Sequence, residues 1–324
     1  MPPSLASKEM PGPPALSLRA LTKRYDDGLL ALDRFDLEVP DGEFFGLLGP
    51  NGAGKSTTVG MLTTTIGPTA GSARLAGFDV AKEPLAARRV SSVVFQEPVV
   101  DRSLTGRRNL EIHARLWSVD PREAAARIDE LAGTFGLGDL IDRPADTYSG
   151  GQRRRLEITR ALVSHPRVLF LDEPTVGLDP RIRAELLEVI ASLRSRTELT
   201  VLLTTHYLEE AERLCDRVAI IHAGRIVALD TPAALLAGLG RQLVEIRVDG
   251  SVNSALASLR ERGVAGEDAF AVGSRVTVPL HRHSSGEAIA AIHDLGLAGA
   301  ISAREPTLDD VYLRLTGDSL AAAA

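Results

Sequence analysis

The sequence predicts an α/β protein with a largely parallel sheet, followed by a smaller α+β unit. Short apolar runs of strand length alternate with amphipathic helical patterns, an order typical of a parallel sheet covered on both faces. The apolar runs occupy residues 44–48, 93–95, 168–171, 201–205 and 218–221, and helical patterns occupy 185–195 and 208–215. Alternating segments at 16–25 and 32–39, joined at Asp27-Gly28, predict a hairpin before the first run.

Two further regions depart from this alternation. Residues 104–146 contain helical patterns without a strand pattern, so we expect a helical insertion, taken as about 97–160, within the sheet unit. Beyond about residue 239 the expected order becomes β-α-β-β-α-β, as in ferredoxin-like units. The segments of that order are 244–248, 252–262, 269–272, 276–280, 286–297 and 300–304. Thr307 and Asp310 then have the spacing of a capping box, which predicts one more helix.

Composition and charge exclude several classes of protein. Of 324 residues, 44% are hydrophobic and 25% are charged, which is average usage for a globular chain and excludes wholesale disorder. No apolar run approaches the ~18–20 residues of a membrane span. The net charge of −6 argues against a dedicated nucleic-acid binder. The single cysteine, Cys215, allows neither an intramolecular disulfide nor a zinc cluster, which favours the cytosol.

These patterns divide the chain into four expected segments. A Pro-rich tail at 1–14 lacks the apolar core of a signal peptide. The sheet unit occupies 15–239, and a small accessory α+β domain occupies 240–318. An Ala-rich tail at 319–324 ends the chain.

A glycine-rich loop follows the first buried strand and opens a helix. It fits the pattern G-x-x-x-x-G-K-[ST], in which the backbone curls so that successive N–H groups point at phosphate oxygens. The helix adds its positive N-terminal end. Lys55 is expected to reach the β- and γ-phosphates, Ser56 to ligate Mg²⁺, and Thr57 to support the α-phosphate. The whole set of loop residues is Gly49, Pro50, Asn51, Gly52, Ala53, Gly54, Lys55, Ser56 and Thr57.

A second acidic motif completes a phosphate-binding and hydrolysis site. The apolar strand at 168–171 runs into Asp172, a carboxylate suited to holding Mg²⁺ through water. Glu173 follows directly and is placed to orient and polarise an attacking water. A GTPase would also need N-K-x-D to recognise guanine, and no asparagine in this sequence precedes a lysine. The motifs therefore predict a nucleotide-binding protein of the phosphate-loop type, a class that also includes kinases and motor ATPases, with Mg²⁺ as the bound metal ion.

The sequence Tyr148-Ser149-Gly150-Gly151-Gln152 then identifies a family resemblance. Over residues 16–238 the chain resembles the ATP-binding subunit of an ABC transporter. By that resemblance Tyr25 stacks on adenine, Gln96 is the Q-loop glutamine that senses Mg²⁺ and water, Asp179 belongs to the D-loop, and His206 contacts the γ-phosphate. The fold implied is an ABC ATPase cassette with an antiparallel β subdomain beside the main sheet.

The resemblance also implies an assembly. Ser149, Gly150, Gly151 and Gln152 open a helix whose amides and Ser149 hydroxyl suit a γ-phosphate. In the family this phosphate belongs to the ATP of a second copy, so a homodimer is expected. The helical insertion would dock on a separately encoded transmembrane permease, at the cytoplasmic face of the membrane. We expect the run Arg153-Arg154-Arg155 to form a solvated or interface surface rather than another phosphate site.

Three segments point to one subfamily. The signature begins with Tyr148 where the commonest form has Leu, and residues 204–211 and 305–312 resemble the daunorubicin-resistance type of exporter ATPase. The expected function is therefore to power export of a drug or hydrophobic natural product. The same cassette also suits another cargo (lipid, haem, polysaccharide or ion), because the permease selects the cargo. A non-transport ABC ATPase acting on ribosomes or DNA is disfavoured by the single cassette, the missing coiled coil and the acidic balance.

Overall fold

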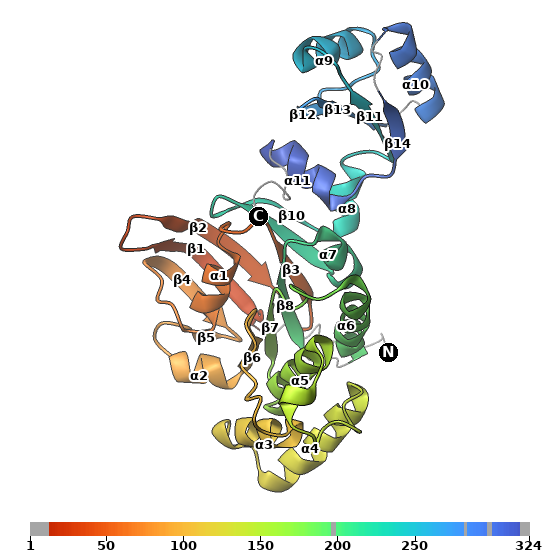
Figure 1. Cartoon of the computed structure of the whole chain (residues 1–324). Coiled ribbons are helices and arrows are strands. Elements are labelled where there is room, and N and C mark those ends of the chain that lie inside the picture. Colours follow the sequence, from red (N-terminus) through yellow and green to blue (C-terminus); the bar gives the residue numbers. More distant parts are fainter. Residues whose placement is uncertain (1–12, 196–198, 282–283, 297–299, 318–324) are drawn as a thin grey trace, which may run out of the picture. The chain divides into compact units, whose positions relative to one another are not determined.

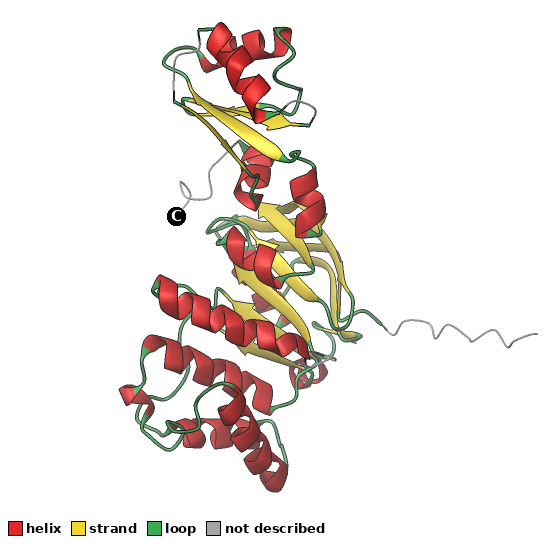
Figure 2. Cartoon of the chain, turned by 90° about the vertical axis from the view of Figure 1, so that its right-hand side faces the viewer, coloured by secondary structure: helices red, strands yellow, loops and turns green. Residues whose placement is uncertain are grey.

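The computed structural model describes residues 13–195, 199–281, 284–296 and 300–317. Most of the predicted tail at 1–14 and all of the tail at 319–324 lie outside the described residues. The chain divides into two compact units. The first unit comprises Met1–Phe45 and Ser56–Thr204, and the second comprises Gly46–Lys55 and Thr205–Ala324. Figures 1 and 2 show the elements of both units.

An antiparallel four-stranded sheet lies in the first unit, in the order β2-β1-β4-β5. Its strands are β1 Leu16–Arg24, β2 Leu30–Val39, β4 Ala70–Leu75 and β5 Phe78–Asp79. Leu16 pairs with both Val39 and Leu75. The predicted hairpin is confirmed, with Gly28 at φ 91° in its turn. Strands β4 and β5 were not predicted, because β4 is short, begins with three exposed residues and has little apolar alternation.

The main sheet is of mixed direction and has the order β10-β9-β3-β8-β7-β6. Its strands are β3 Phe44–Leu48, β6 Ser91–Val94, β7 Val168–Asp172, β8 Thr200–Thr205, β9 Arg217–His222 and β10 Arg225–Asp230. Strands β6, β7 and β8 are parallel neighbours, whereas β9 and β10 are antiparallel. Every residue of β3, β7 and β8 is buried, which explains their continuous apolar sequences.

Short helices flank these strands. They are α1 Lys55–Leu62, α2 Pro84–Arg89, α6 Pro180–Ser192, α7 Leu208–Leu214 and α8 Pro232–Ala237. Helix α6 begins five residues before the expected 185–195, because Asp179 caps it by accepting from the Ile182 N–H at 3.0 Å. Pro180 follows as the first helical residue, where its missing N–H costs nothing.

The expected helical insertion is present. It contains α3 Gly106–Leu116, α4 Pro121–Thr134, a 3₁₀ turn at Ala145–Thr147 and α5 Gly150–Val163. Thr105 and Asp120 cap the first two helices through side-chain oxygens that accept backbone N–H groups. The yellow and lime helices in Figure 1 are these elements.

The C-terminal part of the second unit has the expected element order β-α-β-β-α-β. Its elements are β11 Gln242–Arg247, α9 Val252–Glu261, β12 Phe270–Val272, β13 Arg275–Leu280, α10 Ser285–Asp294 and β14 Ile301–Arg304. The strands pair antiparallel in the order β12-β13-β11-β14. The ferredoxin-like assignment stays a prediction, and residue 297 of the expected 286–297 helix lies outside the described residues.

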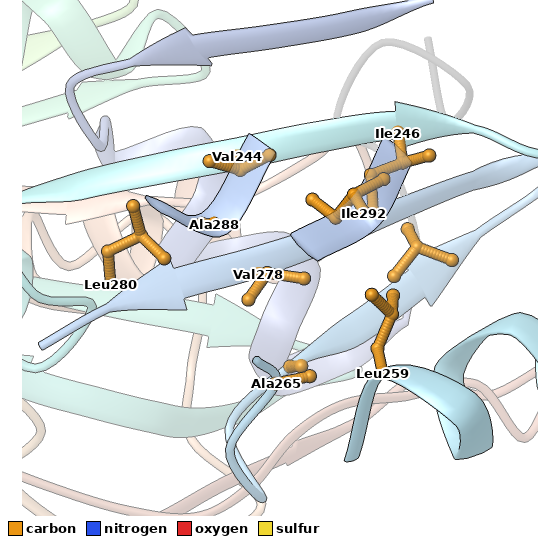
Figure 3. Close-up of a cluster of buried hydrophobic side chains, with 10 residues drawn as sticks. Val244, Ile246, Leu259, Ala265, Val278, Leu280, Ala288 and Ile292 are labelled. Carbon is orange, nitrogen blue, oxygen red and sulfur yellow. The ribbon is translucent and has the colours of Figure 1, made fainter. Parts of the chain in front are cut away.

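Alternation along the strands gives this part its own core. Val244, Ile246 and Val278 form one buried sheet face, against which Leu259 of α9 and Ile292 of α10 pack (Figure 3). A last helix, α11 Leu308–Thr316, begins at the predicted cap. The Asp310 carboxylate accepts from the Thr307 backbone N–H at 2.8 Å and from its hydroxyl at 3.0 Å.

Among the residues that the structure describes, no helix combines the length and the apolar character needed to cross a bilayer.

Candidate ATP-binding and hydrolysis site

The glycine-rich loop lies in the second unit and ends at the first residue of α1. Gly52 and Gly54 have φ of 79° and 109°, a backbone conformation that side chains with a Cβ rarely adopt. A Cβ on Gly49 would lie 2.5 Å from the Ile221 carbonyl oxygen. Lys55 is 4% exposed and donates from Nζ to the carbonyl oxygens of Gly49 and Pro50, at 2.7 and 3.1 Å. The loop therefore closes around its own lysine, at a helix N-terminus suited to phosphate.

The residues that follow the loop lie in the first unit with the predicted adenine platform. The hydroxyls of Tyr25 and Thr57 are 3.2 Å apart, so the tyrosine just after β1 is tied to the first turn of α1. The Lys23 ammonium lies 5.1 Å from the centre of the Tyr25 ring, within range of a cation–π interaction. The half-buried Tyr25 ring therefore lies beside the helix that the phosphate loop opens.

Asp172 and Glu173 lie at the end of β7 and are 6% and 5% exposed. The Asp172 Oδ1 atom is 3.4 Å from the Ser56 hydroxyl oxygen, so the structure brings these two predicted Mg²⁺ residues together. Thr204, at the end of the neighbouring strand β8, donates to the same Oδ1 atom at 2.6 Å. Its hydroxyl also accepts from the Glu173 backbone N–H at 3.0 Å. Thr204 thus links both acids.

Thr204 was not predicted as a site residue and entered only as part of the segment 204–211. The sequence signal that could have identified Thr204 is its hydroxyl at the carboxyl end of an apolar strand. Functional side chains of parallel strands lie close together at that edge of the sheet. Glu173 itself has φ 46°, a left-handed conformation that costs a residue with a side chain about 1–2 kcal/mol. Local hydrogen bonds must hold such a residue in place.

The donor atoms are consistent with Mg²⁺. A serine hydroxyl, a carboxylate and the amide oxygen of Gln96 are hard oxygen ligands, the type that this ion prefers. Gln96 is exposed and lies two residues after the end of β6. The residues present therefore fit a nucleotide with a bound divalent ion.

The predicted signature residues form the start of α5. The Ser149 hydroxyl accepts from the Gln152 N–H at 3.3 Å, and the Gln152 side chain accepts from the Ser149 N–H at 2.8 Å, which is a capping box. A side chain at Gly151 would clash with Ile182 of α6. An open cavity of about 460 Å³ is lined by Ser149, Gln152 and the predicted D-loop residue Asp179.

His206 lies in the second unit, directly after β8. Its ring stands 4.1 Å from that of Tyr207, measured between ring centres. The Thr205 hydroxyl accepts from the Tyr207 N–H at 2.9 Å and donates to the Glu210 carboxylate at 2.9 Å. These bonds fix the turn that presents the half-buried His206.

The expectation for the arginine run is wrong at its centre. Arg154 is 6% exposed and turns into the protein, whereas Arg153 and Arg155 are half-buried. Helical geometry explains the difference, because neighbouring residues on a helix point about 100° apart. The Arg154 guanidinium donates hydrogen bonds to backbone carbonyl oxygens and to the Glu157 carboxylate.

Comparisons with known proteins agree with this geometry. Residues 32–176 match the family described as ABC transporter. The chain is 42% identical to the daunorubicin resistance ATP-binding protein DrrA3 of Streptomyces coeruleorubidus, over 94% of this chain and 96% of that protein. It is 40% identical to the Nod factor export ATP-binding protein I of Burkholderia pseudomallei, over 93% and 97%.

Among solved structures, the dimeric post-hydrolysis state of the ATP-binding cassette MJ0796, bound to ADP and Pi, matches with a TM-score of 0.60 and 25% identity. The match covers 67% of this chain and 98% of that chain. The expected cassette fold is confirmed. The chain belongs to the ATP-binding subunits of the ABC transporter family and is an ABC ATPase.

Proposed function

We propose that this chain is the ATP-hydrolysing subunit of an exporter that moves a drug or hydrophobic natural product through a separately encoded membrane permease. The observation that carries the proposal is the 42% identity to a daunorubicin-resistance ATP-binding protein over 94% of this chain. In this role the chain works as a peripheral subunit at the cytoplasmic face of the membrane. We assign residues 15–239 to the ATPase domain, with the insertion at 97–160, and 240–318 to an accessory domain.

The geometry supports a role for each site residue. The amides of the loop and the Lys55 ammonium bind the β- and γ-phosphates, while the Tyr25 ring stacks on adenine. Ser56, Asp172 and Gln96 hold Mg²⁺, which when bound neutralises charge on the phosphate oxygens. The 3.4 Å between the Asp172 carboxylate and the Ser56 hydroxyl oxygen supports the assignment of these two residues.

Two further residues act on the γ-phosphate. Glu173 accepts a proton from the attacking water, and its near-complete burial raises the effective strength of that interaction. His206 donates to the γ-phosphate from the turn held by Thr205. Each of these roles agrees with a buried or half-buried side chain on a turn fixed by hydrogen bonds.

A second copy of the chain completes the site. Ser149 and Gln152 lie at the N-terminus of α5 beside a cavity that Asp179 also lines, and this cavity receives the γ-phosphate of ATP bound to the partner copy. Support comes from the related cassette whose solved structure is dimeric and bound to ADP and Pi. The ATP therefore joins two copies, and its hydrolysis separates them.

An apolar surface in the first unit suits the permease. Five large apolar side chains that follow β6 or lie on α3 and at its end are between 37% and 71% exposed. They are Phe95, Val99, Ile112, Leu116 and Trp117. Exposed apolar side chains that gather in one region mark a protein interface. Phe95 and Trp117 also line a cavity of about 220 Å³, into which a side chain of the permease inserts.

The proposal is tested by drug efflux from living cells. The chain is expressed with the permease proposed as its partner in a bacterial host sensitive to doxorubicin, and intracellular drug fluorescence is followed. We expect lower accumulation than with the permease alone, and loss of that effect with Glu173→Gln. Equal accumulation with the wild type and Glu173→Gln would exclude doxorubicin as the cargo.

The Nod factor relative favours a second candidate cargo. Its identity to this chain is 40%, close to that of the daunorubicin-resistance relative. If the doxorubicin assay is negative while the complex hydrolyses ATP in membranes, the cargo belongs to the class exported by that relative or to another class selected by the permease.

A further inference from the structure

We propose that Arg154 and Glu157 are positioning residues that hold the segments carrying Gln96 and Glu173 in the geometry needed for hydrolysis. This inference rests on the roles proposed for Gln96 and Glu173, and it adds two residues whose side chains bond to backbone groups and to each other. Both lie on α5, three residues apart, and are 6% and 1% exposed.

Arg154 connects the end of β6 with the turn after β7. Its guanidinium donates to the Pro174 carbonyl at 2.7 Å, to the Glu173 carbonyl at 3.3 Å and to the Asp172 carbonyl at 3.5 Å. The same group donates to the Phe95 carbonyl at 2.5 Å, one residue before Gln96. One buried side chain therefore joins the backbone next to Gln96 to the backbone around Glu173.

Glu157 extends this contact to the far side of Gln96. Its carboxylate accepts from Arg154 at 2.8 Å through one oxygen and from the Val99 backbone N–H at 2.7 Å through the other. The segment from Phe95 to Val99 is thus held at both ends, while Gln96 between them is exposed. The pair restrains the backbone and leaves the Gln96 side chain free to meet a ligand.

Two physical arguments favour positioning over simple packing. Glu173 has the left-handed φ of 46°, and Arg154 binds the carbonyl oxygens at and after that residue, so it stabilises a conformation that the isolated chain disfavours. A buried ion pair contributes little net stability compared with apolar side chains of the same size, but its fixed hydrogen bonds determine one geometry.

The location on α5 adds a functional consequence. Ser149 caps the helix, Gly150 to Gln152 form its first turn, and the Arg154–Glu157 pair follows within the next two turns. A displacement of α5 when the partner's nucleotide binds at its N-terminus therefore reaches Gln96 and Glu173 through rigid, direct bonds. The pair couples closure of the dimer to the alignment of the residues that hydrolyse ATP.

The test compares steady-state ATP hydrolysis by the purified full chain carrying Glu157→Gln or Arg154→Gln. Glu157→Gln keeps the side-chain shape and an oxygen that can accept from Val99, so it preserves the fold while weakening the bond to Arg154. We expect kcat to fall at least tenfold, KM for ATP to change less than threefold, and half-saturation by Mg²⁺ to shift upward because Gln96 is displaced. Arg154→Lys restores part of kcat.

Arg107→Gln is the matched control, because Arg107 also forms ion pairs on a helix, with Asp129 and Asp142, but lies away from the site. Its kcat should stay within twofold of the wild type. The inference is overturned if folded Glu157→Gln and Arg154→Gln enzymes retain kcat within twofold, or if both lose ATP binding together with kcat. A wild-type chain that hydrolyses no ATP contradicts the proposed function itself, which separates the two failures.

Discussion

Thr204 provides a direct test of how the two acids are held. Its hydroxyl donates to Asp172 at 2.6 Å and accepts from the Glu173 N–H at 3.0 Å. The substitution Thr204→Val keeps the volume and the β-branched shape but removes both interactions. The Glu173 N–H keeps a second acceptor, the Thr204 carbonyl at 3.1 Å, so the change acts mainly on the Asp172 carboxylate.

The expected magnitude follows from the charge on Asp172. A hydrogen bond to a charged group contributes about 1.5–3 kcal/mol, so the free energy of unfolding should fall by that amount. Because Asp172 is a proposed Mg²⁺ residue, loss of a group that orients it should reduce Mg²⁺ affinity or kcat by about 10–100-fold. ATP hydrolysis is measured against Mg²⁺ concentration, and stability by urea unfolding.

A threonine on the same strand is the control. Thr200 is also buried, and its hydroxyl accepts from the Gly42 N–H at 2.8 Å, at the opposite end of β8. Thr200→Val should lower stability by about 0.5–1.5 kcal/mol and leave hydrolysis within twofold of the wild type. Equal hydrolysis and equal Mg²⁺ dependence in Thr204→Val and wild-type enzymes would refute the role of Thr204.

Further predictions concern the adenine platform and a buried histidine. Stacking of one base on an aromatic ring contributes about 1–3 kcal/mol, so Tyr25→Ala should raise the Kd for ATP by roughly 5–150-fold. Tyr25→Phe keeps the ring and should change the Kd less than threefold. A calorimetric titration with ATP would count against the platform if Tyr25→Ala bound as tightly as the wild type. Burial, with a smaller contribution from the Arg160 charge, lowers the pKa of His113 to about 4. As the pH falls, the unfolded chain takes up a proton on this histidine near pH 6.5, whereas the folded chain takes it up only near pH 4. The free energy of unfolding is therefore highest above pH 6.5 and decreases toward pH 4, by about 2 kcal/mol between pH 7 and pH 5. Urea unfolding at pH 7 and pH 5 should show that His113→Gln lacks this decrease in the free energy of unfolding. The same pH dependence in the variant and the wild type would contradict the lowered pKa of His113.

Much of the fold could be predicted because its signals are local. The fully buried strand β3 reads as an apolar run, and the loop after it carries the glycines that its positive φ values require. The Thr307–Asp310 cap was also predictable, since two residues only three positions apart determine the whole interaction. In each of these cases the residues that determine the structure are neighbours in sequence.

The remainder depends on contacts between distant residues. Arg154 reaches carbonyl oxygens 18–20 residues away along the chain, as well as Phe95, which is 59 residues away. A run of three arginines looks uniformly polar, so only the packing of α5 distinguishes the buried member. Thr204 likewise acquires its role from strand pairing, because Asp172 is 32 residues distant. The short, mostly exposed β4 carries too little apolar pattern to be recognised.

In the proposed mechanism Glu173 activates the water that hydrolyses ATP, in a site completed by Ser149 of a second copy. The most direct measurement is the molecular mass of the purified Glu173→Gln chain in solution with and without Mg²⁺-ATP, together with its turnover. We expect the variant to bind ATP with turnover reduced at least a hundredfold, and to form a dimer only with ATP, which adding Ser149→Arg abolishes. Normal turnover in Glu173→Gln, or a mass that ATP does not change, would contradict this mechanism.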